Sequence, residues 1–128
     1  MTDWGLAHRL PGMDAVDVAA QDASSVAASP YGSVGVVHSG TDLEAWWILK
    51  DDEKVEPVRA VMDREDLLYV IKGSLRLELG EGETRVLRSG EAFVIPAGTP
   101  FRGYRWPRDG APCLFLAVAP ANATFTRL

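Results

Sequence analysis

The sequence has few of the side chains that bind metals or form disulfides. It contains one cysteine and two histidines among 128 residues. The single thiol, Cys113, excludes an internal disulfide framework and fits a reducing compartment. A protein metal site needs at least three well-placed ligands, usually imidazole, thiolate or carboxylate groups. Because His8, His38 and Cys113 are the only soft or borderline ligands, we expect no bound metal and no other cofactor.

Long apolar runs and basic clusters are also absent. The longest apolar runs, residues 67–71 and 113–119, are far too short to cross a bilayer. The first residues contain no apolar signal-peptide core. The net charge is −5, and no run of lysine and arginine makes a local basic patch. We therefore expect a cytoplasmic protein with neither a membrane nor a nucleic-acid partner.

Apolar residues alternate with polar ones over much of the chain, which is typical of strands with one buried face. Leu75, Leu77 and Leu79 alternate with polar residues, and the glycines at 80 and 82 mark the turn of a hairpin. Many short strands separated by glycine and proline predict an all-β sandwich or barrel. We expect strands at residues 34–38, 43–50, 67–71, 75–79, 84–87, 92–95 and 113–119.

The first thirty residues differ from the rest of the chain. Residues 14–29 are rich in alanine, serine and aspartate and show weak periodicity. They predict an irregular N-terminal arm over residues 1–30, either a short helix, an edge strand or a loosely packed segment. Residues 31–128 then form one barrel domain, because a chain of this length holds a single hydrophobic core.

Two segments carry a distinctive spacing of glycine, proline and acid. The first is Asp66-Leu-Leu-Tyr-Val-Ile-Lys-Gly73, and the second is Gly90-Glu-Ala-Phe-Val-Ile-Pro96-Ala-Gly98-Thr-Pro-Phe101. They resemble the two signature motifs of the cupin family, and the resemblance covers residues 34–120. It implies a cupin-type double-stranded β-helix, also called a jelly-roll barrel. Small cupins of this kind are often bacterial metabolic proteins.

The usual metal ligands of that family are missing here. They are two histidines, a glutamate and a third histidine. Asp66 falls at the glutamate position and Phe101 at the third histidine position. The resemblance therefore implies the fold without its usual metal. The first two histidine positions fall on Arg59 and Val61, or on Ala60 and Met62 if the intervening loop is one residue shorter.

A carboxylate site for magnesium or calcium is the alternative to a metal-free barrel. Asp63, Glu65 and Asp66 are close enough in sequence to form one. Acids that directly precede a strand more often form a solvated turn, so we favour the metal-free interpretation.

An emptied cupin barrel predicts a small-molecule pocket between its two sheets. Successive side chains of a strand point to opposite faces, so the strand at 43–50 directs either Trp46 or Trp47 into the pocket. The other tryptophan then faces solvent, a neighbouring segment or a partner subunit. The motif positions place five further residues in the lining: Arg59, Val61, Asp66, Leu68 and Phe101.

Arginines are interleaved with aromatic residues after the second motif. In this acidic protein they predict a loop at the barrel mouth that binds an anionic or aromatic small molecule. A solvated turn with arginines stacked on aromatic rings is the alternative. We count Arg102 and His38 among the candidate substrate-binding residues. The interleaved residues are Phe101, Tyr104 and Trp106 with Arg102, Arg105 and Arg108.

Arg59 and Asp66 are the sharpest catalytic candidates. As replacements for two metal ligands, their side chains are expected to face each other. The arginine would polarise a carbonyl in place of the cation, and Asp66 would act as general acid or base if burial raises its pKa. Tyr69 or Tyr104 would supply a further proton. This arrangement suits a metal-independent isomerase, lyase or cyclase acting on a small metabolite.

Other interpretations stay open. The Arg59–Asp66 pair would otherwise be structural and merely fill the vacated site. If the protein only binds or senses a small molecule, we expect a pocket whose acid has an ordinary pKa. If it is a scaffold, we expect a barrel plugged by Phe101, Leu68 and a tryptophan. We expect a homodimer in which residues 1–30 pack against or exchange with a partner, because exposed strand edges need covering.

Overall fold

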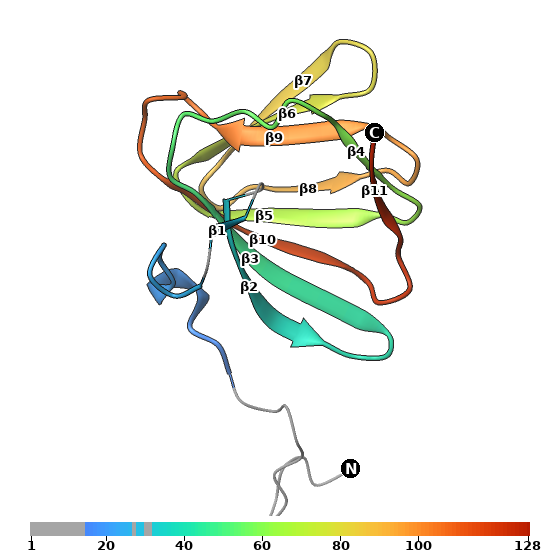
Figure 1. The fold of residues 1–128 in the computed structure, drawn as a ribbon, viewed down its shortest axis with the longest axis horizontal. Coiled ribbons are helices and arrows are strands. Elements are labelled where there is room, and N and C mark those ends of the chain that lie inside the picture. The colour runs from blue at the N-terminus through green and yellow to red at the C-terminus, as the bar shows by residue number, and fades with distance from the viewer. Residues whose placement is uncertain (1–14, 27, 30–31) are drawn as a thin grey trace, which may run out of the picture.

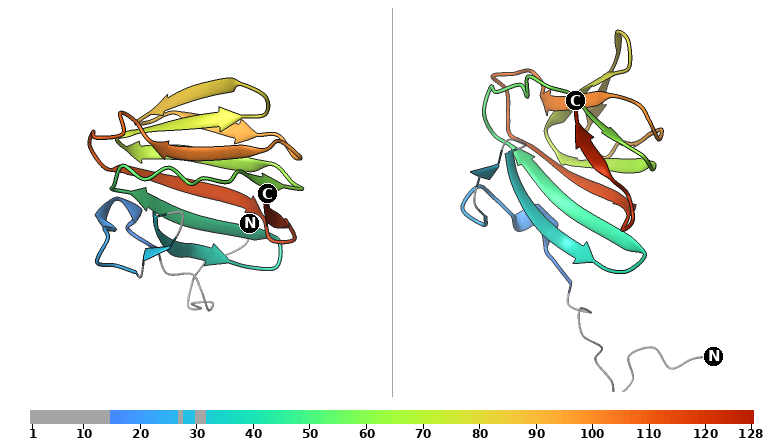
Figure 2. Two further views of the ribbon diagram at one scale, coloured as in Figure 1. Left: turned by 45° about the horizontal axis from the view of Figure 1, so that its top comes forward. Right: turned by 45° about the vertical axis from the view of Figure 1, so that its right-hand side comes forward.

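A computed structural model describes residues 15–26, 28–29 and 32–128, which form two antiparallel sheets (Figures 1 and 2). The first sheet has six strands in the order β1-β2-β3-β10-β5-β8, and the second has five in the order β11-β4-β9-β6-β7. The strands are β1 (Ala28–Ser29), β2 (Gly32–Ser39), β3 (Leu43–Lys50), β4 (Ala60–Met62), β5 (Asp66–Lys72), β6 (Ser74–Leu79), β7 (Glu83–Arg88), β8 (Ala92–Ile95), β9 (Phe101–Arg105), β10 (Cys113–Pro120) and β11 (Phe125–Arg127).

The order of strands in each sheet shows a jelly-roll winding. In the first sheet, β10 pairs with β3 on one side and with β5 on the other. In the second sheet, β9 lies between β4 and β6. Strands far apart in sequence therefore lie side by side, as Figure 1 shows for β3, β10 and β5. The predicted all-β fold class is confirmed.

The β6–β7 hairpin shows how the sequence pattern sets the local structure. Leu75, Leu77 and Leu79 are buried, while the residues between them are partly exposed. The strands pair in register from Ser74 with Arg88 to Leu79 with Glu83. The alternation of apolar and polar residues thus gives this hairpin one face toward the core and one toward solvent.

One predicted loop is a strand. The arginine-rich and aromatic run after the second motif begins with β9, which pairs with β6 along its whole length. Phe101 and Gly103 line the cavity, whereas the side chains of Arg102 and Tyr104 reach Glu78 on the other face of the sheet, and Arg102 also borders the cavity. The interpretation of this run as a loop at the barrel mouth is wrong. Its high glycine and proline content hid a strand whose pairing comes from tertiary contacts.

Most of the hydrophobic core lies between the two sheets. It contains buried residues from β5, β6, β7, β8 and β10, with Val70, Leu75 and Leu77 almost fully buried. A second cluster lies on the outer face of the first sheet, where Trp47 packs with Leu49 and Leu114. The two clusters lie on opposite faces of the first sheet.

Glycine at position 35 makes the second cluster possible. Gly35 lies directly across from Trp47 in the β2–β3 register. A Cβ at Gly35 would collide with the indole ring, so only glycine allows this close approach. The neighbouring segment Val18–Ala20, a single 3-10 turn, also contributes Val18 to the cluster. Trp47 is therefore covered by the described part of the N-terminal segment.

The predicted N-terminal arm is only partly described. Residues 1–14, 27, 30 and 31 lie outside the described residues. The remainder contains the 3-10 turn and the edge strand β1, which pairs with β2. Lys72 on β5 donates a hydrogen bond to the carbonyl oxygen of Ala19 at 2.6 Å. Within the described segments, no helix has the length and apolar character needed to span a bilayer.

Candidate functional site

A cavity of about 360 Å³ lies between the two sheets. Its size falls within the range of small-molecule sites in proteins. Its walls are mostly apolar, and five of the lining residues are charged. The cavity contradicts the interpretation of a plugged barrel. The charged lining residues are Glu44, Lys50, Glu56, Asp66 and Arg102, and the apolar ones include Val34, Trp46, Ile48, Ala60, Met62, Leu68, Phe101, Phe115, Ala117, Ala119 and Phe125.

Small side chains on β10 create this space. Ala117 lies between Trp46 of β3 and Leu68 of β5 in the paired register of the first sheet. Ala119 lies one step further along the same face, next to Glu44. A methyl group at these central positions leaves room above the sheet that a larger side chain would fill. The cavity is thus a consequence of the residues on one central strand.

The alternation of β3 decides which tryptophan enters the cavity. Trp46 lines the cavity, together with Glu44, Ile48 and Lys50 from the same face of the strand. Trp47 is buried on the opposite face. Of the two arrangements left open by the sequence, the structure has Trp46 inside, and a neighbouring segment covers Trp47.

Asp66 is the most deeply buried acid of the cavity. It begins β5 and is 7% exposed. Burial raises the pKa of Asp66 from 3.8 to about 7, because the mostly apolar surroundings penalise the charged carboxylate. Among the described residues, no hydrogen bond or ion pair of its side chain is found. Asp66 can therefore both hold and release a proton near neutral pH.

Glu44 lies at the same end of the cavity as Asp66. Glu44 pairs with Ala119 in the register of β3 and β10. On the other side of β10, Val118 pairs with Leu67, which places Asp66 beside Ala119. The two acids are therefore separated by one strand, or about 10 Å between backbones. This end of the cavity carries two carboxyl groups.

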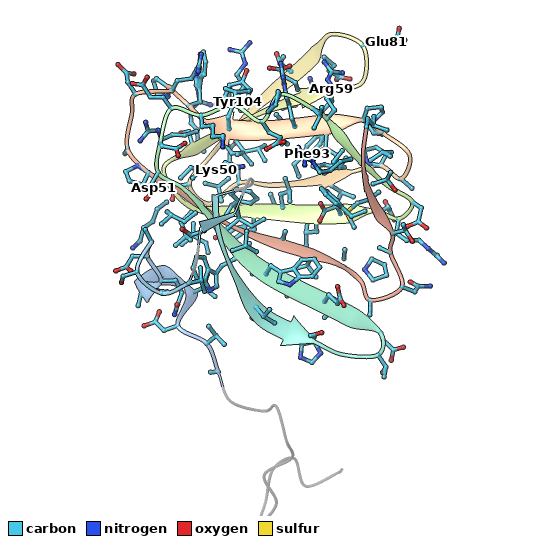
Figure 3. The ribbon with its side chains drawn as sticks, in the orientation of Figure 1. Lys50, Asp51, Arg59, Glu81, Phe93 and Tyr104 are labelled. Carbon is cyan, nitrogen blue, oxygen red and sulfur yellow. The ribbon has the colours of Figure 1, made fainter. Side chains whose placement is uncertain are left out.

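The other end of the cavity carries a different set of charges. Lys50 is the last residue of β3, and Figure 3 shows it at the end of the barrel where the segment beginning at Asp51 leaves the sheet. Burial lowers the pKa of Lys50, although the neighbouring Cys113 and the acids Glu56 and Asp52 act against that shift. The carboxylate of Glu56 is paired with the guanidinium of Arg127.

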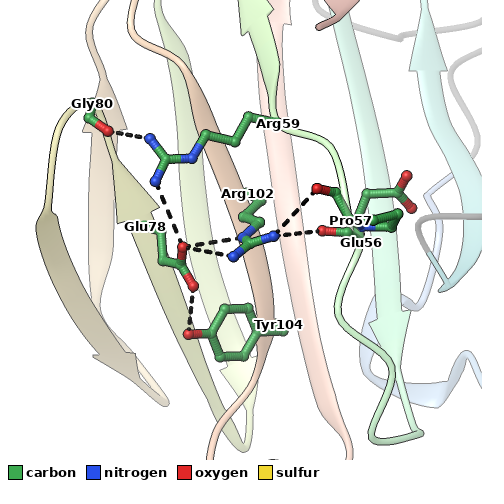
Figure 4. Close-up of polar contacts among 7 residues, drawn as sticks. All are labelled: Glu56, Pro57, Arg59, Glu78, Gly80, Arg102 and Tyr104. Carbon is green, nitrogen blue, oxygen red and sulfur yellow. Dashed lines mark hydrogen bonds and ion pairs between the residues drawn. The ribbon is translucent and has the colours of Figure 1, made fainter.

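Arg59 does not face Asp66. Its guanidinium donates a hydrogen bond to the carbonyl oxygen of Gly80 and lies 3.7 Å from the carboxylate of Glu78 on the outer side of the second sheet (Figures 3 and 4). Arg59 is not among the cavity-lining residues. The prediction that Arg59 faces Asp66 is therefore wrong. The strand that follows Arg59 directs Ala60 and Met62 into the cavity, so the alternate positions, Arg59 and Val61, point away from it.

Glu78 is the centre of this outer network (Figure 4). Tyr104 donates a hydrogen bond to Glu78 at 2.8 Å, and Arg102 donates one at 3.1 Å. Burial alone would raise the pKa of Glu78, but these two hydrogen bonds and the positive charges of Arg102 and Arg59 together lower it below its ordinary value. Arg102 also donates to the carbonyl oxygens of Glu56 and Pro57. The network therefore fastens the segment that carries Glu56 to the second sheet.

Several other predicted site residues lie away from the cavity. Tyr69 is 41% exposed on the outer face of the first sheet. Tyr104 is buried in the Glu78 network, where burial and the hydrogen bond to Glu78 raise its pKa. Val61, Trp47 and His38 do not line the cavity. Of the predicted residues, the structure brings together Asp66, Trp46, Leu68, Phe101 and Arg102.

Sequence reasoning missed three charged residues of the cavity, Glu44, Lys50 and Glu56. Two of them share a strand face with Trp46, so choosing the correct face of residues 43–50 would have found both. Glu56 lies in an irregular segment and has no periodic signal. Its place depends on contacts with Arg102 and Arg127.

Of the two sets of positions that the motif allows for the cupin metal ligands, the set with the shorter loop lines the cavity in full. Its members are Ala60, Met62, Asp66 and Phe101. Alanine and phenylalanine offer no donor atom, and a single carboxylate with a thioether does not make a usual divalent metal site. Within the described residues, no group of three or more histidine, cysteine, aspartate or glutamate side chains is placed to hold an ion. These residues do not fit the metal that the fold family usually binds.

A two-sheet antiparallel barrel with a ligand-sized interior is the architecture expected of cupins, and comparison with known proteins agrees. The family model described as the cupin domain matches residues 45–119, more than half of the chain. The protein therefore belongs to the cupin family. No curated protein matches the chain.

Solved structures support the same fold. The polyketide cyclase RemF from Streptomyces resistomycificus has a TM-score of 0.71 and 23% identity, covering 91% of this chain and 85% of that one. KdgF from Halomonas sp. has a TM-score of 0.56 and 28% identity, covering 70% and 80%. A conserved protein with a double-stranded β-helix domain from Klebsiella pneumoniae has a TM-score of 0.63 and 23% identity, covering 73% and 80%. The predicted double-stranded β-helix is confirmed.

Proposed function

We propose that this cupin is a proton-transfer enzyme that acts on a small, mainly apolar carbonyl compound, with Asp66 as its general acid and base. The observation that carries the proposal is the raised pKa of Asp66, to about 7, inside a cavity of ligand size. A carboxyl group with a pKa near the working pH is present in both protonation states, which general acid–base catalysis requires. Aldol cyclisations, keto–enol isomerisations and dehydrations can each use this step.

An intramolecular aldol cyclisation shows how the chemistry balances. The carboxylate of Asp66 removes a proton from the carbon next to one carbonyl group, which leaves an enolate. The enolate carbon attacks a second carbonyl carbon of the same molecule, so one carbon–carbon bond forms and one carbonyl π-bond breaks. The resulting alkoxide takes the proton back from Asp66. The sequence of steps needs no oxidant and no reductant, and loss of water can follow.

The cavity lining favours a substrate with an aromatic or polycyclic body. Trp46, Phe101, Phe115 and Phe125 contribute aromatic walls, and the remaining lining is largely aliphatic. The polyketide cyclase RemF, which is similar to this chain in fold, agrees with this substrate class. The exclusion of water by such walls also strengthens the interaction between Asp66 and a developing charge.

Exchange of α-protons tests the proposal without knowledge of the natural substrate. β-Tetralone and related aryl ketones are incubated with the protein in deuterium oxide, and loss of the α-proton signals is followed by NMR. Binding of each ketone is first confirmed by a change in tryptophan fluorescence, because Trp46 lines the cavity. We expect the exchange rate to rise with pH and to level off above about 7, as the base form of Asp66 becomes populated.

Two variants distinguish catalysis by Asp66 from a general effect of removing a negative charge. Asp66→Asn should reduce exchange to the uncatalysed rate while the ketone still binds. Glu65→Gln removes an exposed acid next to it in sequence and should leave exchange unchanged. If every ketone that binds to the wild-type protein exchanged its α-protons at the uncatalysed rate, the proposal that the protein is a proton-transfer enzyme would be refuted. It would favour a small-molecule-binding protein, which the open cavity also suits.

A further inference from the structure

Two acids of the cavity lie on either side of one small residue. Ala119 of β10 lies between Glu44 of β3 and Asp66 of β5 in the paired register of the first sheet. All three residues line the cavity, and Ala119 is buried. The methyl group of Ala119 leaves the space between the two acids open to a ligand.

The next level of the cavity is apolar on both sides. Ala117 of β10 pairs with Trp46 of β3 and with Leu68 of β5, and these residues also line the cavity. The methyl groups of Ala117 and Ala119 are about 7 Å apart along the strand, and together they form a flat floor on which the ring system of a ligand can lie. One edge of such a ring system faces β3 and the opposite edge faces β5, as the strand order β3-β10-β5 in Figure 1 shows.

Glu44 is the charged residue that borders this floor on β3. Among the described residues, its side chain makes no hydrogen bond or ion pair. The other charged residue that β3 contributes to the cavity, Lys50, lies six residues away, where the acid Glu56 acts on it. Arg102 and Glu56 each form an ion pair with another side chain. Of the charged residues that line the cavity from the first sheet, Glu44 is therefore the one that shares an end with Asp66.

A carboxylate at this position selects a hydrogen-bond donor. It accepts hydrogen bonds and donates none, so the ligand must supply an N–H or O–H group. An ammonium group would also stabilise the ionised form of Asp66, whose backbone lies about 10 Å from that of Glu44, and would weaken Asp66 as a base. A neutral hydroxyl group binds Glu44 without this effect. It belongs on the edge of the ring system opposite the carbon that loses its proton.

We propose that Glu44 is a specificity-determining residue: it accepts a hydrogen bond from a hydroxyl group of a fused-ring ketone, on the edge opposite the carbon that reacts at Asp66. The inference names the substrate class of the cavity and rests on the proposed function for the role of Asp66. Glu44 binds and orients the ring system in this scheme and takes no part in proton transfer. Its loss should therefore weaken the binding of hydroxylated ketones alone.

A pair of ketones that differ in one hydrogen-bond donor tests the role of Glu44. One is β-tetralone with a hydroxyl group on the far edge of its aromatic ring, and the other carries at the same position a methoxy group, which cannot donate. Isothermal titration calorimetry measures the dissociation constants of both for the wild-type protein, Glu44→Met, Glu44→Gln and Glu81→Met. Glu81 is an exposed acid in the turn between β6 and β7 (Figure 3), so its variant makes the same change in net charge outside the cavity.

We expect the wild-type protein to bind the hydroxy ketone about tenfold more tightly than the methoxy ketone, as is usual for one hydrogen bond to a charged group. Glu44→Met should weaken binding of the hydroxy ketone by about tenfold. Binding of the methoxy ketone should be unchanged, which also shows that the cavity is intact. Glu44→Gln still offers an acceptor oxygen and should keep part of the preference. Glu81→Met should bind both ketones like the wild-type protein.

The inference is overturned if the wild-type protein does not prefer the hydroxy ketone, whether it binds both ketones equally or neither of them. It is also overturned if Glu44→Met keeps the preference, or if this variant weakens the binding of both ketones equally.

The same titration with Asp66→Asn keeps the two proposals apart. The preference for the hydroxy ketone should persist in this variant, because Glu44 lies on a different strand and still lines the cavity. A failed exchange assay together with a preference that depends on Glu44 would overturn proton transfer alone. Catalysed exchange without that preference would overturn the role of Glu44 alone.

Discussion

Asp66 places an ionisable group among mostly apolar side chains. Its pKa is raised from 3.8 to about 7, so the folded protein holds a proton at pH values where the unfolded chain has released it. By linkage, the contribution of Asp66 to stability is fully present below its ordinary pKa of 3.8. That contribution is lost as the pH rises through about 7. The proposed catalytic acid is thus a source of instability in alkaline solution.

Asp66→Asn should remove this dependence on pH. Because asparagine cannot ionise, we expect the variant to be more stable than the wild-type protein at about pH 8.5. The shift of pKa corresponds to a gain of up to about 4 kcal/mol in the free energy of unfolding. At about pH 4 the gain should fall below about 1 kcal/mol, because the unfolded carboxyl is then only partly ionised. Urea unfolding at both pH values measures it, with Glu65→Gln as the control. If the free energy of unfolding differed between Asp66→Asn and the wild-type protein by the same amount at both pH values, the burial of Asp66 would be contradicted.

At the scale of single elements, β4 decides which residues reach the cavity. Ala60 and Met62 line the cavity, while Val61 between them does not. If the register of a strand shifts by one residue, the side chains that pointed inward point outward, and those that pointed outward point inward. For this reason we assign the cupin ligand positions on this strand to Ala60 and Met62, which corresponds to the shorter of the two loops that the motif allows before Asp66.

A histidine graft tests this assignment. Ala60→His, Met62→His and Phe101→His, combined in one protein that keeps Asp66, should create a site for one divalent ion, because all four positions line the cavity. Zinc content after dialysis, measured by elemental analysis, should approach one equivalent. The matched control is Arg59→His, Val61→His and Phe101→His, which should bind far less because two of its imidazoles point outward. Equal metal content in the two proteins would show that the assignment of faces is wrong.

Strands with clear periodicity were the predictable part of this fold. The expected strands at 43–50 and 92–95 have the bounds of β3 and β8, and most others differ by one or two residues. The short strands β4 and β11 and the strand β9, which contains Gly103, were not predicted. These three lie next to one another in the second sheet, and their pairing depends on distant partners more than on local pattern.

The candidate site was predicted in part for a related reason. Asp66, Leu68 and Phe101 lie in the cavity as the motif positions indicated. The placement of Arg59 was wrong because the motif allows two loop lengths, and sequence alone does not choose between them. The choice between Trp46 and Trp47 was also open, because both are large and apolar. They are distinguished by tertiary packing on Trp47, to which Gly35 and Val18 contribute.

At the scale of the whole molecule, the described residues cover only part of the outer face of the first sheet. Val18 and Val26 pack on the part near Trp47. The part over β5 and β8 remains exposed, with Leu67 at 39%, Tyr69 at 41% and Val94 at 43%. Leu67 is paired with Val94, so the exposed side chains are contiguous. A contiguous apolar patch on a sheet is typical of a surface that contacts another protein.

The homodimer expected from the sequence can be tested on this patch. Leu67→Glu with Val94→Glu should shift a dimer to monomer, because burying two like charges against their symmetry mates is unfavourable. Light scattering coupled to size-exclusion chromatography measures the mass. The control is Val36→Glu, which alters an exposed valine on β2 and should leave the mass unchanged. A dimer that survives the double substitution would place the interface elsewhere, and a monomeric wild-type protein would refute the dimer itself.

The small residues of β10 have a consequence for how this protein can diverge. Backbone hydrogen bonds of β10 to β3 and β5 do not depend on the size of the side chains at 117 and 119. A single codon change from Ala117 to valine or leucine would shorten the space above the sheet while leaving the strand order intact. Ligand size can therefore drift in a lineage by small steps at two positions, largely independent of the selection that maintains folding.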